Sequence, residues 1–419
     1  MFGRKKPEVL VVGAGPVGLM AALTLARRGV RVQIIDEAWR PAAHAYALAL
    51  HPGAMALLDR LGVAQAVREV AYPVRGLGLF RGAERRERLD LAGLDAATPY
   101  VAVFRQSLLE DLLTAELAKL DVKVEWNHRL ARMVGRDEHV DVTINRLEKD
   151  SVGYAVGQTE WMVASAKDAE VPFVIGADGH RSLVRRRLEV GFPEVGRAQH
   201  FAVFEFSTDA DLDHEMAVVL NEGDSNVVWP LPDGRVRWSF ELPGYDHPED
   251  DRHKNRLMVE LAGAKYPMLD EDHLHELLAT RAPWFKGRVS EVKWRLVVRF
   301  ERRLADAFGV GRVWLAGDAG HMTSPVGVQS MNVGLAEAHE LGVIMADALQ
   351  GKVNAKTALD AYGAGRLAEW KRLFGKKGGY AATEATPAWL APYAGELAAA
   401  LPASGAGLDA LLGQVGVRR

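Results

Sequence analysis

The amino-acid sequence predicts an α/β protein in which a β-rich domain, with a mixed or antiparallel sheet, interleaves with a domain built on a parallel sheet. Three observations predict this fold class. A strand, a glycine-rich turn and a helix open the chain. Alternating apolar and polar residues over 201–242 then predict an antiparallel sheet, and segment 313–316 returns to a buried-strand pattern. Because the first pattern resumes after the second, the two units are predicted to be interleaved rather than consecutive.

The composition limits the classes of function. The 419 residues are 48% apolar, which suffices for two or three folding units with cores of their own. The 52 basic and 55 acidic residues leave no excess of positive charge, so nucleic acids and membranes are not expected as partners. The absence of cysteine excludes disulfides, cysteine-ligated zinc and thiol nucleophiles, and no metal site is predicted. Any redox chemistry therefore needs a bound cofactor.

The N-terminal elements are a strand, Val9–Val12, a helix, Pro16–Arg28, that Gly29 ends, and a second strand, Val30–Ile35. The uncharged run 9–26 has the length of a membrane span. Glycines and a proline inside it favour a strand, a turn and a buried helix instead. The protein is accordingly predicted to be cytoplasmic.

The rest of the chain continues with helices and strands. Helices are expected at 52–61, at 107–120 with Ser107 as N-cap, at 333–349 and at 355–374, and strands at 122–126, 140–145, 171–176, 293–300 and 313–316. The tail from Gly375 to Arg419 is rich in Ala, Gly and Pro. Its spaced leucines predict short docked helices.

The turn after the first strand has the pattern G-x-G-x-x-G, with Gly13, Gly15 and Gly18, and Asp36 ends the next strand. The first glycine permits the turn, the second lets the backbone approach a pyrophosphate, and the third allows helix and strand to pack. The aspartate would accept hydrogen bonds from a ribose. The motif predicts a Rossmann-like dinucleotide site. A ligand-free glycine turn is the alternative, and the motif alone does not separate NAD from FAD.

Three further motifs follow in order. They are Arg105-Gln106-Ser107-Leu108-Leu109, the run Gly176–Arg185 that contains Asp178-Gly179, and Gly317-Asp318-Ala319-Gly320-His321 before Pro325. With the glycine turn they resemble the signatures of class A FAD-dependent monooxygenases, the para-hydroxybenzoate hydroxylase-like family of aromatic and polyketide hydroxylases. The resemblance spans residues 7–373.

The resemblance implies a domain organisation and a reaction. A Rossmann-like FAD-binding domain would comprise 1–75, 100–185 and 300–375, a substrate domain 76–99 and 186–299, and a helical tail 376–419. NADPH or NADH would reduce FAD, and the reduced flavin would use O₂, through a C4a-hydroperoxide, to hydroxylate a small aromatic or polycyclic, secondary-metabolite-like substrate. The alternatives are an FAD-dependent oxidoreductase that inserts no oxygen and a flavin-containing regulator of a partner enzyme. A homodimer is a further expectation, with the tail covering the FAD domain or joining the dimer contact.

The residues expected to contact FAD come from these motifs and the segments beside them. They are Gly13, Gly15, Pro16, Val17, Gly18, Asp36, Glu37, Arg105, Gln106, Leu130, Asp178, Gly317, Asp318, Pro325, Gly327, Val328, Met331 and Asn332. By the resemblance, Asp318 would hold the ribityl chain and Asp178 would lie near the pyrophosphate. His321 is either a packing residue or a proton carrier. The runs Arg185–Arg187 and Lys376–Lys377 are interpreted as solvated.

Candidates for the walls of the substrate pocket are Tyr46, Trp229, Trp238, Phe240 and Trp294. An aromatic residue in a strand belongs more often to the core, so both interpretations stay open for the strand residues. No catalytic base is singled out. His200, His214, Tyr245 and Arg237 remain undistinguished.

Two segments depart from the family pattern. Tyr46 stands where the family has an arginine near the pyrophosphate and the nicotinamide. The family loop Gly-Gly-Gln-Gly-Met-Asn reads Gly327-Val328-Gln329-Ser330-Met331-Asn332. Because glycine permits unusual backbone angles, Val328 is expected to stiffen this loop. We therefore expect the flavin to move less freely than in the family.

Overall fold

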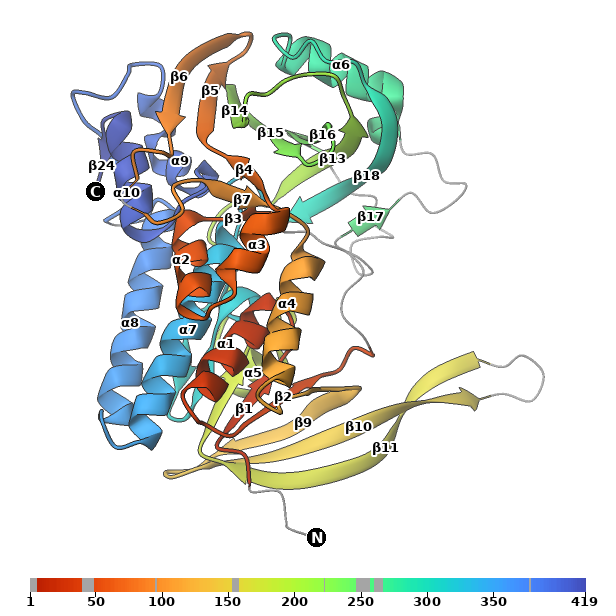
Figure 1. Cartoon of the computed structure of the whole chain (residues 1–419), viewed down its shortest axis with the longest axis vertical. Coiled ribbons are helices and arrows are strands. Elements are labelled where there is room, and N and C mark those ends of the chain that lie inside the picture. The colour runs from red at the N-terminus through yellow and green to blue at the C-terminus, as the bar shows by residue number, and fades with distance from the viewer. Residues whose placement is uncertain are drawn as a thin grey trace.

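In the computed structural model the chain forms two interleaved sheet domains, with a third, three-stranded sheet at one end (Figure 1). The structure describes residues 6–39, 49–94, 96–152, 158–221, 223–245, 257–259, 267–376 and 378–419. Tyr46, one of the predicted pocket residues, lies outside the described residues. Within those ranges, no helix combines the length and the apolar character that a bilayer crossing requires.

The first domain is built on a six-stranded sheet in the order β20-β21-β12-β1-β2-β8. Its strands are β1 (Val9–Val12), β2 (Val32–Asp36), β8 (Val124–Trp126), β12 (Phe173–Gly176), β20 (Gly309–Val310) and β21 (Val313–Leu315). All neighbours pair in parallel except β20 with β21. The chain leaves β1 for β2 on one side and later returns to β12 on the other. Ligands of such sheets bind at this crossover, beyond the carboxyl ends of the strands.

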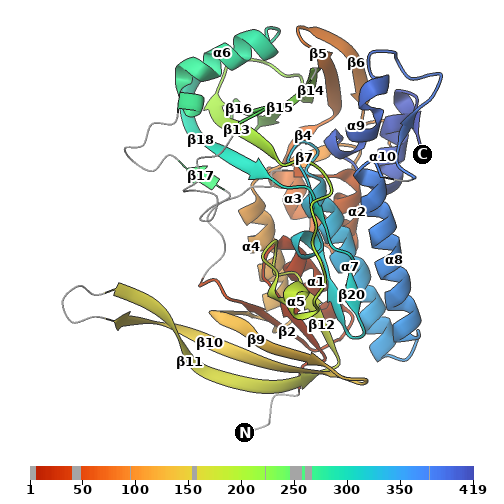
Figure 2. The same cartoon turned by 180° about the vertical axis from the view of Figure 1, so that it is seen from behind.

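Helices cover one face of this sheet, and a second sheet covers the other (Figure 2). The helices are α1 (Pro16–Arg27), α4 (Gln106–Ala118) and α7 (Gln329–Leu349), with α8 (Ala355–Leu373) packed against α7. The covering sheet consists of β9 (His128–Gly135), β10 (Val140–Val152) and β11 (Gln158–Val171). Its Leu130, Val142 and Ile144 are buried against Leu10 and Val174.

Several element boundaries differ from the predicted ones. Helix α4 begins at Gln106, with Arg105 as its N-cap and no side-chain cap bond, so the prediction of Ser107 as N-cap is wrong. Helix α7 begins at Gln329 rather than at Val333. The reason is Val328, whose left-handed conformation (φ 51°, ψ 34°) turns the chain directly into the helix.

The second domain is an eight-stranded mixed sheet in the order β17-β18-β13-β16-β15-β14-β5-β6. Its strands are β5 (Gly76–Arg81), β6 (Glu84–Asp90), β13 (Gln199–Ser207), β14 (Glu215–Asn221), β15 (Asp224–Leu231), β16 (Arg235–Glu241), β17 (Leu257–Val259) and β18 (Ser290–Phe300). Only β14 and β5 pair in parallel. Helix α6 (Glu271–Arg281) covers one face of this sheet, and the other face joins the core of the first domain (Figure 1).

Short elements connect the two domains. They are β3 (Ala49–Leu50), α2 (Pro52–Arg60), α3 (Ala64–Val70), β4 (Tyr72–Val74), β7 (Val101–Val103), α5 (Leu183–Arg187), β19 (Arg303–Leu304) and β22 (His321–Met322). The tail forms β23 (Ala381–Ala382), α9 (Ala394–Ala400), α10 (Gly405–Gln414) and β24 (Val417–Arg418). Its leucines at 390, 397, 401, 408 and 411 are buried, so the prediction of short docked helices is confirmed.

Candidate functional site

The glycine turn between β1 and α1 combines two kinds of glycine. Gly13 has a φ of 103°, and a Cβ there would lie 2.2 Å from the carbonyl oxygen of Ala177. A Cβ on Gly18 would lie 1.9 Å from the carbonyl oxygen of Gly13. At Gly15, by contrast, a Cβ would meet no atom within 4 Å. Gly13 and Gly18 are therefore required by the packing of the protein itself, whereas Gly15 leaves room for a ligand beside the N-terminus of α1.

Asp36, at the end of β2, is fixed by the backbone around it. Its Oδ2 accepts a hydrogen bond from the Ala14 amide at 2.7 Å, and its Oδ1 accepts one from the Ala38 amide at 2.7 Å. The half-buried carboxylate also borders a polar cavity of about 580 Å³. A carboxylate has more lone-pair sites than these two bonds use, so Asp36 can also accept from the hydroxyls of a sugar.

Residues from both sides of the glycine turn line this polar cavity. Those predicted from the sequence are Gly13, Gly15, Asp36, Glu37, Leu130 and Asp178. Four arginines that the sequence analysis did not propose as site residues also line it: Arg129, Arg181, Arg186 and Arg187. Arginine is well suited to bind phosphate oxygens. The signal that could have identified three of them is their position at the motif Gly176–Arg185, since Arg181 lies within it and Arg186 and Arg187 directly follow it.

Asp178 and Arg185 hold the loops around the cavity. The Asp178 carboxylate accepts from Ser182 Oγ at 2.6 Å and from the amides of Leu183 and Val184 at the start of α5. Burial raises the pKa of the Asp178 carboxyl, and these bonds oppose that effect. Arg185 is buried rather than solvated, which corrects its predicted exposure. Its guanidinium donates to the carbonyls of Ala319 and His180 and so joins two of the motif loops.

A second, mostly apolar cavity of about 420 Å³ adjoins the polar one. Predicted residues that line it are Gly15, Pro16, Val17, Gln106, Asp318, Pro325, Val328, Met331, Trp229 and Trp294. Gly15, Ala177 and Gly179 line both cavities. The two cavities therefore adjoin at the glycine turn, and we describe them below as the charged lobe and the aromatic lobe of one two-lobed cavity.

The aromatic wall comes from one face of the eight-stranded sheet of the second domain. Trp229 in β15 lies opposite Arg237 in β16, and both line the cavity. The Arg237 guanidinium bonds Glu205 at 2.9 Å and lies 5.0 Å from the centre of the Trp294 ring. Trp238 and Phe240 point to the other face, into the core under α6, so the prediction that they form pocket walls is wrong. Their position follows from the alternation of side chains along β16.

The four candidates for a catalytic base lie in different places. Arg237 is the one that lines the cavity among the described residues, and it is held there by Glu205. His214 stacks on Tyr72 and its Nδ1 bonds the carbonyl of Pro73. His200 packs edge-on against Tyr245 at 5.3 Å. The structure therefore does not bring a histidine or tyrosine of this set to the cavity.

Five of the predicted cofactor residues line neither lobe: Gly18, Arg105, Gly317, Gly327 and Asn332. A Cβ on Gly317 would lie 2.9 Å from Val17, and one on Gly327 would lie 2.4 Å from the carbonyl oxygen of Ala399. Arg105 is an exposed N-cap of α4 and lines neither lobe in the described part of the chain. The close contacts at 317 and 327 explain why glycine is needed at these two positions.

The segment 325–332, called the flavin loop below, is held by residues distant in sequence. The buried Asn332 side chain donates to the carbonyls of Ala49 and Val328 and accepts from the amide of His51. His51 Nε2 lies 2.8 Å from the carbonyl oxygen of Gly327. Burial lowers the pKa of His51 from 6.5 to about 4, so the imidazole is neutral and Nε2 donates to Gly327.

Gln329 joins the flavin loop to the tail. Its buried amide nitrogen lies 2.6 Å from the carbonyl oxygen of Leu401, 2.7 Å from that of Ala403 and 3.2 Å from that of Ala398. Gln329 is not among the residues predicted to form the site. The tail therefore covers this part of the first domain, which is one of the two positions predicted for it.

His321 lies behind the aromatic lobe and is fully buried. Its Nε2 lies 2.9 Å from Glu337 Oε2, and its ring stacks on Trp370 at 3.7 Å. Of the two roles predicted for His321, packing and proton transfer, these contacts correspond to packing.

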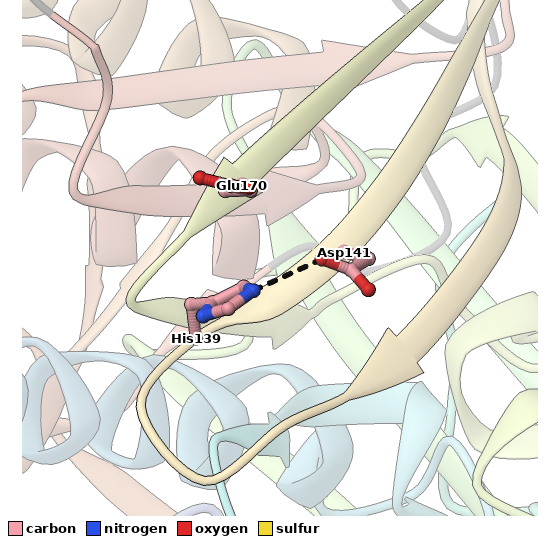
Figure 3. Close-up of side chains that lie close together, drawn as sticks. All are labelled: His139, Asp141 and Glu170. Atoms are coloured by element: carbon pink, nitrogen blue, oxygen red, sulfur yellow. Dashed lines mark hydrogen bonds and ion pairs between the residues drawn. The ribbon is translucent and has the colours of Figure 1, made fainter.

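His139, Asp141 and Glu170 form a separate polar cluster at the base of β10 and β11 (Figure 3). Potential ligand atoms of the three lie within 4.8 Å of one another. Asp141, however, already pairs with Arg136 and His139, and Glu170 pairs with Lys6. Because Arg136 and Lys6 neutralise the half-buried Asp141 and the exposed Glu170, we assign no metal to the cluster.

The chain is similar to known proteins in sequence and in fold. The FAD binding domain family matches residues 6–375. Over 374 residues the chain is 32% identical to 6-methylpretetramide 4-monooxygenase of Streptomyces rimosus, covering 88% of this chain and 60% of that protein. Over 369 residues it is 29% identical to pentachlorophenol 4-monooxygenase of Sphingobium chlorophenolicum, covering 84% and 60%. The chain thus spans about three-fifths of the length of these relatives.

Solved structures share the fold. The p-nitrophenol 4-monooxygenase of Pseudomonas putida superposes with a TM-score of 0.66 at 24% identity, and the alignment covers 87% of this chain and 85% of that one. An aklavinone-11 hydroxylase, solved with FAD and aklavinone, superposes with a TM-score of 0.62 at 25% identity, covering 89% and 69%.

Proposed function

The chain belongs to the FAD binding domain family of class A flavoprotein monooxygenases, and we propose that it is a monooxygenase that uses NADPH or NADH and O₂ to hydroxylate an aromatic or polycyclic substrate. The observation that carries the proposal is the two-lobed cavity, whose charged and aromatic lobes adjoin at Gly15. A dinucleotide with one charged half and one planar aromatic half matches such a space.

The residues present fit FAD. The unfilled space at Gly15 and the N-terminus of α1 suit a diphosphate, with Arg181 and Arg186 available for its charge. Asp36 and Asp318 can accept hydrogen bonds from ribose and ribityl hydroxyls. The chemistry that bound FAD supplies is transfer of two electrons from a nicotinamide and activation of dioxygen. We propose residues 1–75, 100–185 and 300–375 as the FAD-binding domain.

The protein's own contribution is to bind and orient the substrate and to exclude water. Trp229, Trp294 and Phe300 offer flat apolar surfaces to an aromatic ring, and Arg237 presents a guanidinium toward the same space. We propose residues 76–99 and 186–299 as the substrate domain. The relatives' names support an aromatic substrate, since two of them refer to a chlorinated phenol and a nitrophenol.

The remaining partners follow from the reaction. A nicotinamide must approach the open side of the cavity and leave again, because only one glycine fingerprint is present in the sequence. We propose a cytoplasmic location, where NADPH and NADH are supplied, and a homodimer as the assembly.

One experiment tests the proposed activity. The purified protein is reconstituted with FAD, its flavin absorption is recorded, and NADPH and NADH consumption are followed with a panel of phenols and polycyclic phenols. The proposal predicts a substrate that both accelerates consumption and leaves as a hydroxylated product containing oxygen from isotopically labelled O₂. A protein that does not retain FAD, or that consumes NAD(P)H without labelling any product, contradicts it.

The second candidate is an FAD-dependent oxidoreductase that acts on a similar substrate without inserting oxygen. The observation that favours it is Val328, a valine in the left-handed conformation on the cavity wall, where the family has glycine. The labelled-oxygen measurement separates the two candidates, since an altered but unlabelled product supports the second.

A further inference from the structure

A row of four side chains crosses the eight-stranded sheet on the face that borders the aromatic lobe. Trp229 in β15 lies opposite Arg237 in β16, Arg237 lies opposite Glu205 in β13, and Glu205 lies opposite Trp294 in β18. Residues directly opposite each other in neighbouring strands place their side chains on the same face. Trp229, Arg237 and Trp294 also line the lobe. The row therefore presents one guanidinium and two indole rings to the cavity.

The hydrogen bonds of Arg237 fix its guanidinium at one edge. Nε and Nη2 both donate to Oε2 of Glu205, at 3.3 and 2.9 Å. The guanidinium carbon lies 5.0 Å from the centre of the Trp294 ring, and the side chain is only 13% exposed. In the part of the chain that the structure describes, no group accepts a hydrogen bond from Nη1. Because Arg237 lines the aromatic lobe, Nη1 is available to a ligand there.

Positive charge exceeds negative charge at this wall. Glu205 also accepts from Arg235 at 2.9 Å, so two guanidiniums share one carboxylate. Asp233 lies 3.7 Å from Arg235, but it is 85% exposed, so solvent screens its charge. The aromatic lobe is lined by three further titratable groups, His180, Arg299 and Asp318. Because an arginine keeps its proton in proteins, Arg237 adds a permanent cation to a mostly apolar surface, and an anionic group of a ligand is favoured beside Nη1.

The character of the wall indicates which anion fits. Trp229, Trp294 and Val203 give it apolar surfaces. Ser239, two residues after Arg237 on β16, adds a hydroxyl on the same face. A carboxylate carries its charge on two oxygens and needs several donors, which an apolar wall does not supply. A phenolate carries a single oxygen and spreads part of its charge into a ring that can lie against the tryptophans, so the wall fits a phenolate better.

We propose that Arg237 is a catalytic residue that binds the phenol oxygen of the substrate through Nη1 and holds it as a phenolate. The inference deepens the proposed function and rests on it for the hydroxylation. On binding, the O–H bond of the phenol breaks, its electron pair stays on the oxygen, and the proton passes to bulk water. A phenolate ring is richer in electrons than a phenol ring, which suits the electrophilic transfer of oxygen. Arg237 thereby achieves by electrostatics what a general base would achieve by proton transfer.

The probe for this site is p-nitrophenol, because its phenolate is yellow and the neutral phenol is colourless. Difference spectra of the protein with and without the probe, recorded as the pH is raised, give the pKa of the bound phenol. In the wild type we expect binding to favour the phenolate about tenfold or more, since a charge-assisted hydrogen bond forms. The pKa of the bound phenol should fall accordingly. Arg237→Met should return it to the value of free p-nitrophenol.

Arg235→Met is the matched control. It removes the other guanidinium from Glu205, and Arg235 is not among the described residues that line the cavity. We expect the pKa of bound p-nitrophenol to stay lowered in this variant. Competition by p-nitrobenzoate and by nitrobenzene, which carry the same ring with a carboxylate or with no acidic group, tests the kind of anion. Both should bind the wild type about tenfold or more weakly than p-nitrophenolate does.

An unchanged pKa of the probe in the wild type, or no binding of p-nitrophenol, overturns the proposal. So does a lowered pKa that persists in Arg237→Met, or an equal loss in both variants, which would show that only the charge around Glu205 matters. Tight binding of p-nitrobenzoate would show a carboxylate site and overturn the proposal too.

Two provisions keep the test decisive. If Arg237→Met does not fold, Arg237→Gln removes the charge but keeps a donor for Glu205, and the same result is expected of it. The spectra require neither NAD(P)H nor turnover. A protein that hydroxylates no substrate therefore refutes the proposed function, while the spectra still decide whether Arg237 holds a phenolate.

Discussion

The glycine turn and the flavin loop border the same cavity, yet they are built in opposite ways. In the turn, neighbouring backbone leaves no room for side chains. A Cβ on Gly13 would lie 2.2 Å from the carbonyl oxygen of Ala177, and one on Gly18 would lie 1.9 Å from that of Gly13. The flavin loop contains few such glycines and is held by Asn332, His51 and Gln329, whose partners lie far away in the sequence. The acceptors of Gln329 even lie beyond residue 375, where the family match ends.

This difference shows how a loop can keep its shape after losing its glycines. Val328 has a φ of 51°, a conformation that a β-branched residue adopts only under constraint. The left-handed conformation costs a non-glycine residue about 1–2 kcal/mol. The hydrogen bonds of Gln329 and Asn332, which follow Val328 in the chain, supply the constraint.

The largest effect is expected at the glycine turn. Gly13→Ala places a Cβ against the Ala177 carbonyl at a φ of 103°, so we expect the free energy of unfolding to fall by more than about 4 kcal/mol. Gly15→Ala is the matched control, because a Cβ there meets no protein atom. Thermal unfolding of the FAD-free proteins should separate the two, with FAD affinity lost in both. Equal stability of the two variants would contradict the distinction between packing and ligand glycines.

The next effect concerns the link between the flavin loop and the tail. Gln329→Glu replaces an amide donor that faces three carbonyl oxygens by a carboxylate that can only accept. We expect the free energy of unfolding to fall by about 3 kcal/mol or more. Gln329→Met, which removes the bonds without adding a charge, should cost about 2 kcal/mol. Urea unfolding measures both. If the two variants lost the same amount, the carbonyls would not be the partners that matter.

The third effect is a dependence of stability on pH. The pKa of His51 is about 4 in the folded chain and 6.5 when unperturbed, so protonation favours the unfolded state. Above pH 6.5 this effect leaves the free energy of unfolding unchanged. As the pH falls from 6.5 toward 4, the free energy of unfolding decreases by about 3 kcal/mol. His51→Gln keeps an amide donor for Gly327 but does not titrate. The difference in unfolding free energy between wild type and variant should therefore change over this interval, and a constant difference would exclude His51 as the source.

The smallest effect on stability is expected at Val328. In Val328→Gly the relief of about 1–2 kcal/mol of backbone strain offsets about 1.5–3 kcal/mol of lost burial, so stability changes by about 1 kcal/mol. The proposed stiffening of the loop predicts faster flavin reduction by NAD(P)H, up to about tenfold in stopped-flow traces. Val328→Ala removes side-chain bulk but keeps a non-glycine residue at the strained backbone angle. It therefore separates the effect of bulk from the effect of backbone strain on the reduction rate. Equal reduction rates in wild type and Val328→Gly would end the stiffening hypothesis.

Much of the fold could be predicted because its signals are local. The strand, glycine turn and helix at 9–28 and the ordered motifs at Arg105, Asp178 and Asp318 define the first domain by spacing alone. The face of the eight-stranded sheet on which Trp238 lies could not be predicted in this way. Trp229 and Trp238 lie on opposite faces only because β15 and β16 pair with Val228 opposite Trp238, and both faces of this sheet are buried. Likewise, nothing near Gln329 in the sequence indicates acceptors at Leu401 and Ala403.

The bonds of Gln329 also impose an order of assembly during synthesis. Its acceptors follow it by 69, 72 and 74 residues, so they are translated after every other element that borders the cavity. At about 5–20 residues per second, the ribosome needs several seconds to make this stretch. During that interval the glycine turn and both sheets can already fold, while the flavin loop lacks the carbonyls that fix it. A nascent chain should therefore acquire high affinity for its cofactor only once the tail has docked.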